Sequence, residues 1–259
     1  MEGTDRRARS AELEEGHDAG ARARVSPWAR LVLLSVVLVL GGAVAVAAWD
    51  FGSVQERLVS YPVTGAVGGV AFDLGDAGIV IVGGGRRSSV DVQRRERFSF
   101  GHAAESRRTV AGGVFRVRSR CPASLPSSCS VRYRVVVPDN VPVEIRTDGG
   151  GVRFEDYRGS ARVTTRSGDI DVDGFCGFSL QARADSGDVR ADASCPPQQL
   201  SLRATTGSVH AIVPPGRYRV DAQSASGDQS IRGVAETTDA PFSIQALSSS
   251  GDVLVEQGT

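Results

Sequence analysis

A short turn phrase recurs six times between Val143 and Val255, and it constrains the fold of this chain more than any other feature. The phrase reads Ser-Gly-Asp in four copies, Thr-Gly-Ser in one and Gly-Gly-Gly in the first. Spacings of 18, 19, 20, 20 and 24 residues separate its central glycines, which are Gly150, Gly168, Gly187, Gly207, Gly227 and Gly251. A period near 20 residues with a turn in a fixed place is typical of a solenoid, in which each repeat forms one coil.

Apolar residues keep fixed distances from these glycines. The positions two and four residues after each glycine, and five and seven before it, are Val, Ile, Leu, Phe or Ala, with Gln229 the exception. Alternation with period two on both sides of the turn predicts two short strands per coil with one face buried. Glycine suits a turn that needs a positive φ, and Ser or Asp beside it can bond nearby backbone amides.

The region before the repeats also breaks into short β-rich segments. Asp76-Ala77-Gly78 is read as a degenerate copy of the turn, with Phe72 and Ile79 at the expected core positions. Arg94–Val110 is charged and poorly periodic, so we expect a loop or an irregular hairpin there.

Two cysteines occupy the same place in consecutive coils. Cys176 and Cys195 each follow their turn glycine by eight residues. Neighbouring strands lie about 4.8 Å apart, inside the Cα–Cα range of about 4.4–6.8 Å that a disulfide tolerates. The register therefore predicts a Cys176–Cys195 disulfide, and the remaining Cys121 and Cys129 then close a short loop. Two disulfides indicate an oxidising compartment. A four-cysteine zinc site is the alternative, but no close Cys-x-x-Cys pair is present.

The amino end predicts a membrane anchor. Residues 1–28 are expected to be a disordered cytoplasmic tail, because Met1–Pro27 has six acidic residues, five arginines and few large apolar side chains. Residues 29–50 are expected to form a transmembrane helix that contacts the lipid bilayer through residues 31–49, whose 19 residues span about 28 Å. A membrane-proximal linker (51–62) and an extracytoplasmic domain (63–259) would follow.

Charge beside the apolar segment sets the expected orientation. Arg22, Arg24 and Arg30 precede it, which places the amino end in the cytoplasm and the long carboxy-terminal part outside. A cleaved signal peptide is the alternative, since Ala45-Val46-Ala47 resembles a cleavage site.

Composition argues against several functional classes. Net charge is zero and aromatic content is 6%, so no global basic field indicates nucleic-acid binding. The three histidines share no spacing for a metal site or triad, and no Gly-x-Ser-x-Gly elbow is present. We expect no cofactor and no catalysis. Acid–base chemistry of the kind used by β-helix lyases and hydrolases is the enzyme alternative.

Two sets of residues are candidate sites. A calcium ladder could use the aspartates of the turns, although Ca²⁺ wants six to eight oxygen ligands and a structural role is the competing interpretation: Asp169, Asp188, Asp228 and Asp252. A strip of guanidinium groups could hold an anionic envelope polymer, because Arg pairs well with phosphate and carboxylate: Arg146, Arg153, Arg183, Arg190 and Arg203, with His210. A mixed, solvated surface is the alternative for the strip.

A membrane anchor followed by Ser-Gly-Asp-(Ile/Val) repeats resembles the bacterial "putative adhesin" domain family of unknown function. The resemblance covers roughly Val63–Val255 and rests on the turns at Ser167–Asp169, Ser186–Asp188, Ser226–Asp228 and Ser250–Asp252. It implies a single-stranded β-solenoid at the cell surface and brings no catalytic residues.

The sequence thus predicts an all-β, single-stranded β-solenoid of about 20 residues per coil behind one transmembrane helix. The expected function is adhesin-like binding of a polymer or surface protein, or scaffolding. The alternative is an accessory that senses envelope stress and reports through the tail. Because only Glu256–Thr259 follow Val255, we also expect an uncapped last strand that could support end-to-end self-association.

Overall fold

The structure is a computed structural model that describes residues 27–65, 67–85, 89–99, 101–123 and 128–258. It divides into two units, Met1–Trp49 and Asp50–Thr259. Helix α1 (Pro27–Ser53) contains Leu31–Ala48, a segment long and apolar enough to cross a membrane and exposed over its whole length. It is therefore a candidate membrane anchor or signal sequence. The predicted tail lies outside the described residues, apart from its last two.

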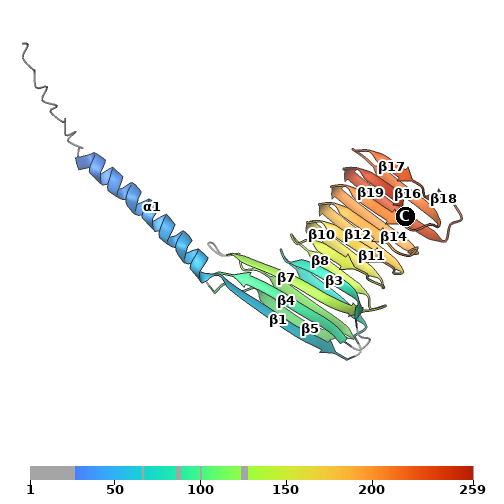
Figure 1. The fold of residues 1–259 in the computed structure, drawn as a ribbon, viewed down its shortest axis with the longest axis horizontal. Helices are drawn as coiled ribbons and strands as arrows, with labels where there is room; N and C mark the ends of the chain where they lie inside the picture. Colours follow the sequence, from blue (N-terminus) through green and yellow to red (C-terminus); the bar gives the residue numbers. More distant parts are fainter. Residues whose placement is uncertain (1–26, 66, 86–88, 100, 124–127, 259) are drawn as a thin grey trace, which may run out of the picture. The chain divides into compact units, whose positions relative to one another are not determined.

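The second unit contains two ten-stranded sheets that enclose one hydrophobic core (Figure 1). In sheet A the spatial order is β1 (Gln55–Thr64), β4 (Ser89–Phe98), β7 (Cys129–Pro138), β3 (Gly78–Gly85), β9 (Val152–Glu155), β11 (Ile170–Phe175), β13 (Val189–Ala193), β15 (Val209–Val213), β20 (Val253–Gln257), β17 (Gln229–Arg232). In sheet B it is β18 (Ala235–Glu236), β16 (Arg217–Ser224), β19 (Phe242–Ser250), β14 (Gln199–Thr206), β12 (Ser179–Ser186), β10 (Ala161–Ser167), β8 (Val143–Thr147), β2 (Gly69–Leu74), β6 (Val114–Arg120), β5 (Glu105–Ala111).

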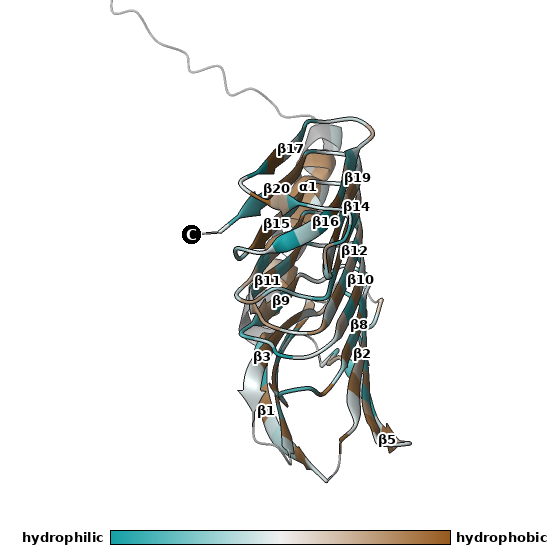
Figure 2. Ribbon diagram, turned by 90° about the vertical axis from the view of Figure 1, so that its right-hand side faces the viewer, coloured by the Kyte–Doolittle hydropathy of each residue, from teal (hydrophilic) through white to brown (hydrophobic). Residues whose placement is uncertain are grey.

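Each repeat contributes one strand to each sheet, which confirms the predicted β-solenoid. Strands of successive repeats pair in parallel at the predicted register: Val163 lies opposite Ala182, and Ile170 lies opposite Val189. The two sheets form facing layers, with β1 and β5 at the same end (Figure 2). The antiparallel strands β1, β4 and β5 close that end.

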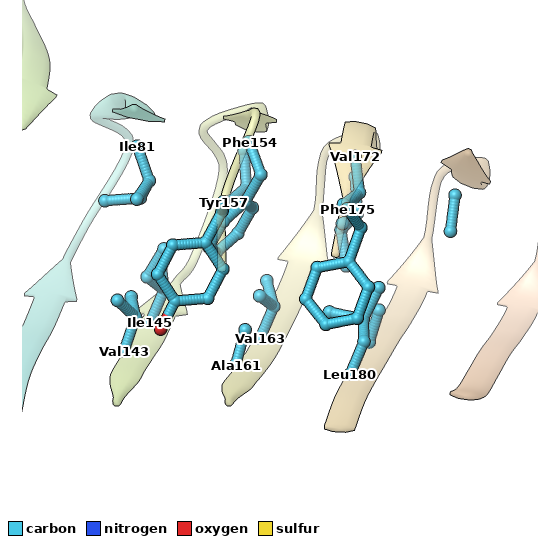
Figure 3. Packing of buried hydrophobic residues seen from close by; sticks show 14 of the residues in the cluster. Ile81, Val143, Ile145, Phe154, Tyr157, Ala161, Val163, Val172, Phe175 and Leu180 are labelled. Carbon is cyan, nitrogen blue, oxygen red and sulfur yellow. The ribbon is translucent and has the colours of Figure 1, made fainter. Parts of the chain in front are cut away.

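Aromatic residues widen an otherwise narrow core of Val and Ala. Tyr157 and Phe175 point between the sheets beside Phe154 and Leu180 (Figure 3). The Tyr157 hydroxyl donates a 2.6 Å hydrogen bond to the carbonyl of Val141, and burial raises the pKa of this hydroxyl. The buried polar atom is thus satisfied by backbone, as a close-packed core requires.

Coils do not stack in sequence order at either end. The β6–β7 coil pairs outside the β2–β3 coil, so β2 and β3 lie between it and β8–β9. The β19–β20 coil lies between β14–β15 and β16–β17. The premise of an uncapped last strand is therefore wrong, because β20 is paired on both sides. The last full coil is β16–β17, with the two-residue strand β18 paired outside β16, and the exceptional Gln229 is exposed on β17.

The predicted degenerate turn occupies a full coil position. Phe72 lies opposite Ile145, and Ile79 lies opposite Val152. Ala77 therefore stands where later coils have the turn glycine, and the β2–β3 coil belongs to the same repeat series.

Two segments contain strands that the sequence did not predict. The predicted linker 51–62 is occupied by the end of α1 and by β1, which pairs antiparallel with β4. The segment Arg94–Val110, expected to be a loop or an irregular hairpin, contains the end of β4 and most of β5. Apolar periodicity did not predict β4 because two of its inward positions are charged. Arg94 and the fully buried Glu96 form a 3.0 Å ion pair inside the sandwich.

Both predicted disulfides are present, and they pair Cys176 with Cys195 and Cys121 with Cys129. The Cα–Cα distances are 5.0 Å and 5.8 Å, respectively. Cys176 lies after β11 and Cys195 after β13, so the first bridge joins consecutive coils as the register requires.

Cross-linking tests the order of the coils. Outward-facing Leu254 on β20 lies opposite His210 on one side and Ser230 on the other. We expect the double variant His210→Cys/Leu254→Cys to form a new disulfide, because neighbouring strands hold Cα atoms within bonding range. The matched pair His210→Cys/Ser230→Cys is separated by a whole strand and should stay reduced. Peptide mapping by mass spectrometry would refute this order if it found the opposite pattern.

Candidate functional site

The repeated turns form a continuous column along one edge of the sandwich, where β10, β12, β14, β19 and β16 hand over to sheet A. Turn glycines in this column have φ between 133° and 153°, a region that favours glycine: Gly168, Gly187, Gly207, Gly227 and Gly251. A Cβ on any of them would also collide with backbone atoms of the next coil, as it would at Gly150 against Ala77. The predicted turn glycines thus allow the coils to approach one another.

The turn aspartates bind the backbone of the neighbouring coil. The Asp169 carboxylate accepts from the amide N–H of Asp188 at 2.9 Å, and the Asp188 carboxylate accepts from that of Ser208 at 2.7 Å. The Ser208 hydroxyl accepts from the Asp252 N–H at 3.3 Å, and the Asp252 carboxylate accepts from that of Asp228 at 2.9 Å. These bonds run in spatial order through four successive pairs of coils. Together they form a ladder of hydrogen bonds between the turns. Ser208, which departs from the Ser-Gly-Asp phrase, continues this ladder and accepts the longest of the four bonds.

This geometry favours the structural interpretation of the aspartates over the calcium ladder. One oxygen of each of three carboxylates is already used by a backbone amide, whereas Ca²⁺ needs six to eight oxygens converging on one point. Within the described ranges, no group of three or more His, Cys, Asp or Glu side chains is arranged to hold a metal ion.

The predicted ligand strip does not lie on one face. Arg153, Arg190 and His210 are on outward positions of sheet A, on β9, β13 and β15. The other three members, Arg146, Arg183 and Arg203, are on outward positions of sheet B. At its turn glycine each repeat passes from a strand of sheet B to a strand of sheet A. Residues on the two sides of the turn therefore project from different sheets. The six residues therefore form two rows, one on the outer face of each sheet, and a ligand on either row stays a prediction.

Most members of the strip are already paired. Arg153 contacts Asp171 at 2.8 Å, and Arg146 contacts Glu144 at 2.7 Å. Arg183 lies 3.4 Å from Asp185, and Arg203 donates to Gln245 at 2.6 Å. On sheet A, Arg190 donates to His210 Nδ1 at 2.8 Å and His210 Nε2 contacts Glu256 at 2.9 Å. Such exposed pairs contribute about 0–1 kcal/mol each to the free energy of unfolding. They leave a surface of mixed charge that repels neither anions nor cations.

Shallow grooves cross both outer faces where small residues interrupt long ones. On sheet A a groove of about 540 Å³ lies over Gly78 and Gly151, between Arg132 and Arg153. On sheet B a groove of about 320 Å³ lies over Ala71, between Arg116 and Glu144. Open grooves over flat sheets fit an extended polymer or a protein segment better than a small molecule, which needs a concave, largely enclosed site.

Sequence reasoning missed an arginine-rich end. Residues 54–137 have 13 arginines and six carboxylates, whereas residues 138–259 have 11 arginines and 17 carboxylates. The net charge of zero conceals this asymmetry, and separate counts for the two halves would have found it. At this end the Arg108 guanidinium lies 4.3 Å from the centre of the Tyr61 ring, joining β5 to β1 across the sandwich. Burial raises the pKa of the Tyr61 hydroxyl, and Arg108 partly opposes this effect.

Comparison with known family models finds a match in the repeat region. Residues 140–257 match the model of the family described as Toastrack DUF4097, so this part of the chain is similar to that family. No curated protein matches the chain.

Among solved structures, the chain is similar to a "putative adhesin" from Bacteroides fragilis, with 11% identity and a TM-score of 0.45 over 79% of this chain and 98% of that one. It is also similar to a "putative cell adhesion protein" from Clostridium sporogenes, with 11% identity and a TM-score of 0.42 over 79% and 100% of the two chains. A "putative adhesin" from Parabacteroides distasonis gives 11% identity and a TM-score of 0.31 over 78% and 97%.

Substitution of one turn aspartate tests the ladder. Asp188→Ala removes the acceptor for the Ser208 amide, and we expect it to lower the free energy of unfolding by about 0.5–1 kcal/mol, since the bond is exposed. Asp188→Asn keeps an acceptor oxygen and should cost less. Asp185→Ala, which removes only a surface ion pair on the same coil, is the control. Urea unfolding in which all three variants match the parent would contradict a role for the carboxylate.

Because neighbouring coils approach closely at the turns, substitution of a turn glycine should lower the free energy of unfolding more than substitution of a turn aspartate. Gly207→Ala places a methyl group against the carbonyl of Gly187 at a φ of 135°, and we expect a loss of about 2 kcal/mol or more. Gly112→Ala, at a φ of 59° with open space around it, should cost only about 1 kcal/mol. Equal melting temperatures for the two variants would show that the contact between coils is unimportant.

Proposed function

We propose that this chain is a non-enzymatic module of the cell envelope, anchored by α1 and holding its β-solenoid outside the cytoplasm for binding or scaffolding. The observation that carries the proposal is the direct connection of two dissimilar parts. An exposed apolar helix ends at Ser53, and a disulfide-bonded sandwich begins at Gln55. An exposed apolar helix requires lipid, while disulfides persist in oxidising compartments, so the connection favours an anchor with an exported domain.

The outer surface supports a binding or scaffolding role. Outward side chains repeat along the solenoid axis at the spacing of neighbouring strands, about 4.8 Å. The long faces thus present polar groups and open grooves at regular intervals to an extended envelope polymer or a surface protein. On these faces the carboxylates of Glu144 and Asp171 pair with arginines, and that of Asp169 accepts from a backbone amide in a turn, which fits a structural role for these three groups.

Orientation follows from charge next to the helix. Three arginines lie just before or at the start of the apolar segment, and this excess predicts a cytoplasmic amino end. A short cytoplasmic tail is also where a sensor would report, so deletion of residues 1–26 separates two roles. Unchanged surface binding without the tail supports the adhesin-like role, and loss of a cytoplasmic response supports signalling.

Membrane extraction and proteolysis test the anchor. Expressed as the full chain in a bacterial host with an amino-terminal epitope, the protein should stay in the membrane after alkaline extraction at its full mass. Protease added to spheroplasts should remove the carboxy-terminal domain and leave the epitope intact. Recovery of a soluble protein that starts just after Ala47 would instead establish a cleaved signal peptide and overturn the anchor.

A further inference from the structure

The strands at the β1/β5 end of the sandwich carry arginines without acidic partners. Across the described ranges, no carboxylate lies within ion-pair distance of four exposed arginines: Arg57 on β1, Arg95 and Arg97 on β4, and Arg107 on β5. In the repeats Arg146, Arg153 and Arg183 each have an acidic neighbour, whereas other exposed arginines of the described residues, such as Arg162 and Arg217, have no carboxylate within ion-pair distance. The two parts differ instead in their balance of charge: arginines outnumber carboxylates by 13 to six in residues 54–137, whereas carboxylates outnumber arginines by 17 to 11 in residues 138–259.

Exposed apolar side chains gather at the same end. In the unit Asp50–Thr259 three large hydrophobic residues are mostly exposed among those described: Leu58 (62%), Val110 (63%) and Phe178 (60%). Leu58 lies on β1 opposite Arg95, and Val110 lies on β5. Two of the three thus belong to edge strands, Leu58 in sheet A with Arg57, Arg95 and Arg97, and Val110 in sheet B with Arg107.

Chain connectivity places the first residue of β1 close to the last residue of α1. Only Val54 separates the last residue of α1 from the first residue of β1, a reach of about 7 Å in an extended chain. With α1 in a membrane, as the proposed function has it, β1 starts within the headgroup region of the bilayer.

We propose that the β1/β5 end is a membrane-contact surface that binds anionic phospholipid headgroups of the leaflet in which α1 ends. The four arginines would pair with lipid phosphates, and Leu58 and Val110 would enter the boundary between headgroups and acyl chains. Arginine is suited to phosphate because its planar fork donates two parallel hydrogen bonds. Exposed apolar residues among basic ones are what an interfacial membrane site needs. The excess of carboxylates in residues 138–259 disfavours the same leaflet, so the charge asymmetry would orient the solenoid away from the membrane.

Vesicle binding of the isolated domain tests this contact without relying on α1. Residues 54–259 contain the whole hydrophobic core and both disulfides, so this fragment should fold alone. We expect it to co-sediment with vesicles of phosphatidylcholine mixed with phosphatidylglycerol, to bind far less to pure phosphatidylcholine, and to dissociate as salt rises above about 0.1 M.

Matched charge variants locate the surface. The variant Arg57→Gln/Arg95→Gln/Arg97→Gln/Arg107→Gln should lose at least tenfold in partitioning, since each arginine near an anionic leaflet contributes roughly fivefold. The control, Arg162→Gln/Arg217→Gln/Arg219→Gln/Arg232→Gln, makes the same change of net charge on exposed positions of the repeats and should bind as the parent does. Equal losses in both variants would overturn the proposal.

A tryptophan reporter measures insertion directly. The chain's two tryptophans, Trp28 and Trp49, lie outside the fragment, so a single new one is seen without background. Leu58→Trp emission should shift to the blue with anionic vesicles, whereas Phe178→Trp, equally exposed but in the repeats, should not shift. Far-ultraviolet circular dichroism would confirm that each variant is folded.

Two further results of the vesicle experiment would overturn the proposed lipid surface. Binding to soluble polyphosphate but not to anionic vesicles would overturn the lipid surface and identify an anionic polymer as the ligand. No binding by a folded fragment would overturn it too, while leaving membrane extraction as the separate test of the anchor.

Discussion

Contact between the turns of neighbouring coils is the interaction on which the rest of the solenoid depends. At each turn a glycine lets two backbones approach too closely for any side chain, and an aspartate or serine bridges them through an amide. The contact fixes the register of every strand that follows. It therefore aligns the valine and alanine columns of the core and brings Cys176 beside Cys195.

The same contact leaves the order of the coils open. Each turn presents nearly identical donors and acceptors on both sides, so a coil can stack on any other that carries the turn. This explains how β19–β20 can insert between two earlier coils without disturbing the ladder, with Ser208 and Asp228 as its new neighbours. Order is set by the ends: antiparallel β1 and β5 close one end, and polar Gln229 suits the other, where its side chain meets water.

Local repetition made the fold predictable, and non-local pairing limited the prediction. The glycine period gave the coils, the core columns and the cysteine pair, since all three depend on residues a fixed number of positions apart. It could not give the swapped order or the strand in the supposed linker, because these depend on partners distant in sequence and on the buried Arg94–Glu96 pair. The division of the ligand strip between two faces was missed for a simpler reason: a tight turn sends neighbouring residues to different sheets. The basic end was hidden by a net charge of zero.

Amide hydrogen exchange at the turns is the most direct test of this account. The N–H groups of Asp188, Ser208, Asp228 and Asp252 belong to exposed residues or lie in exposed turns, yet each has an acceptor on the next coil. The account predicts that they exchange as slowly as amides of the adjoining strands, and equally slowly with calcium or with a chelator. Exchange at the rate of an unfolded peptide without calcium, with protection only when calcium is added, would contradict it and make the turns a metal site.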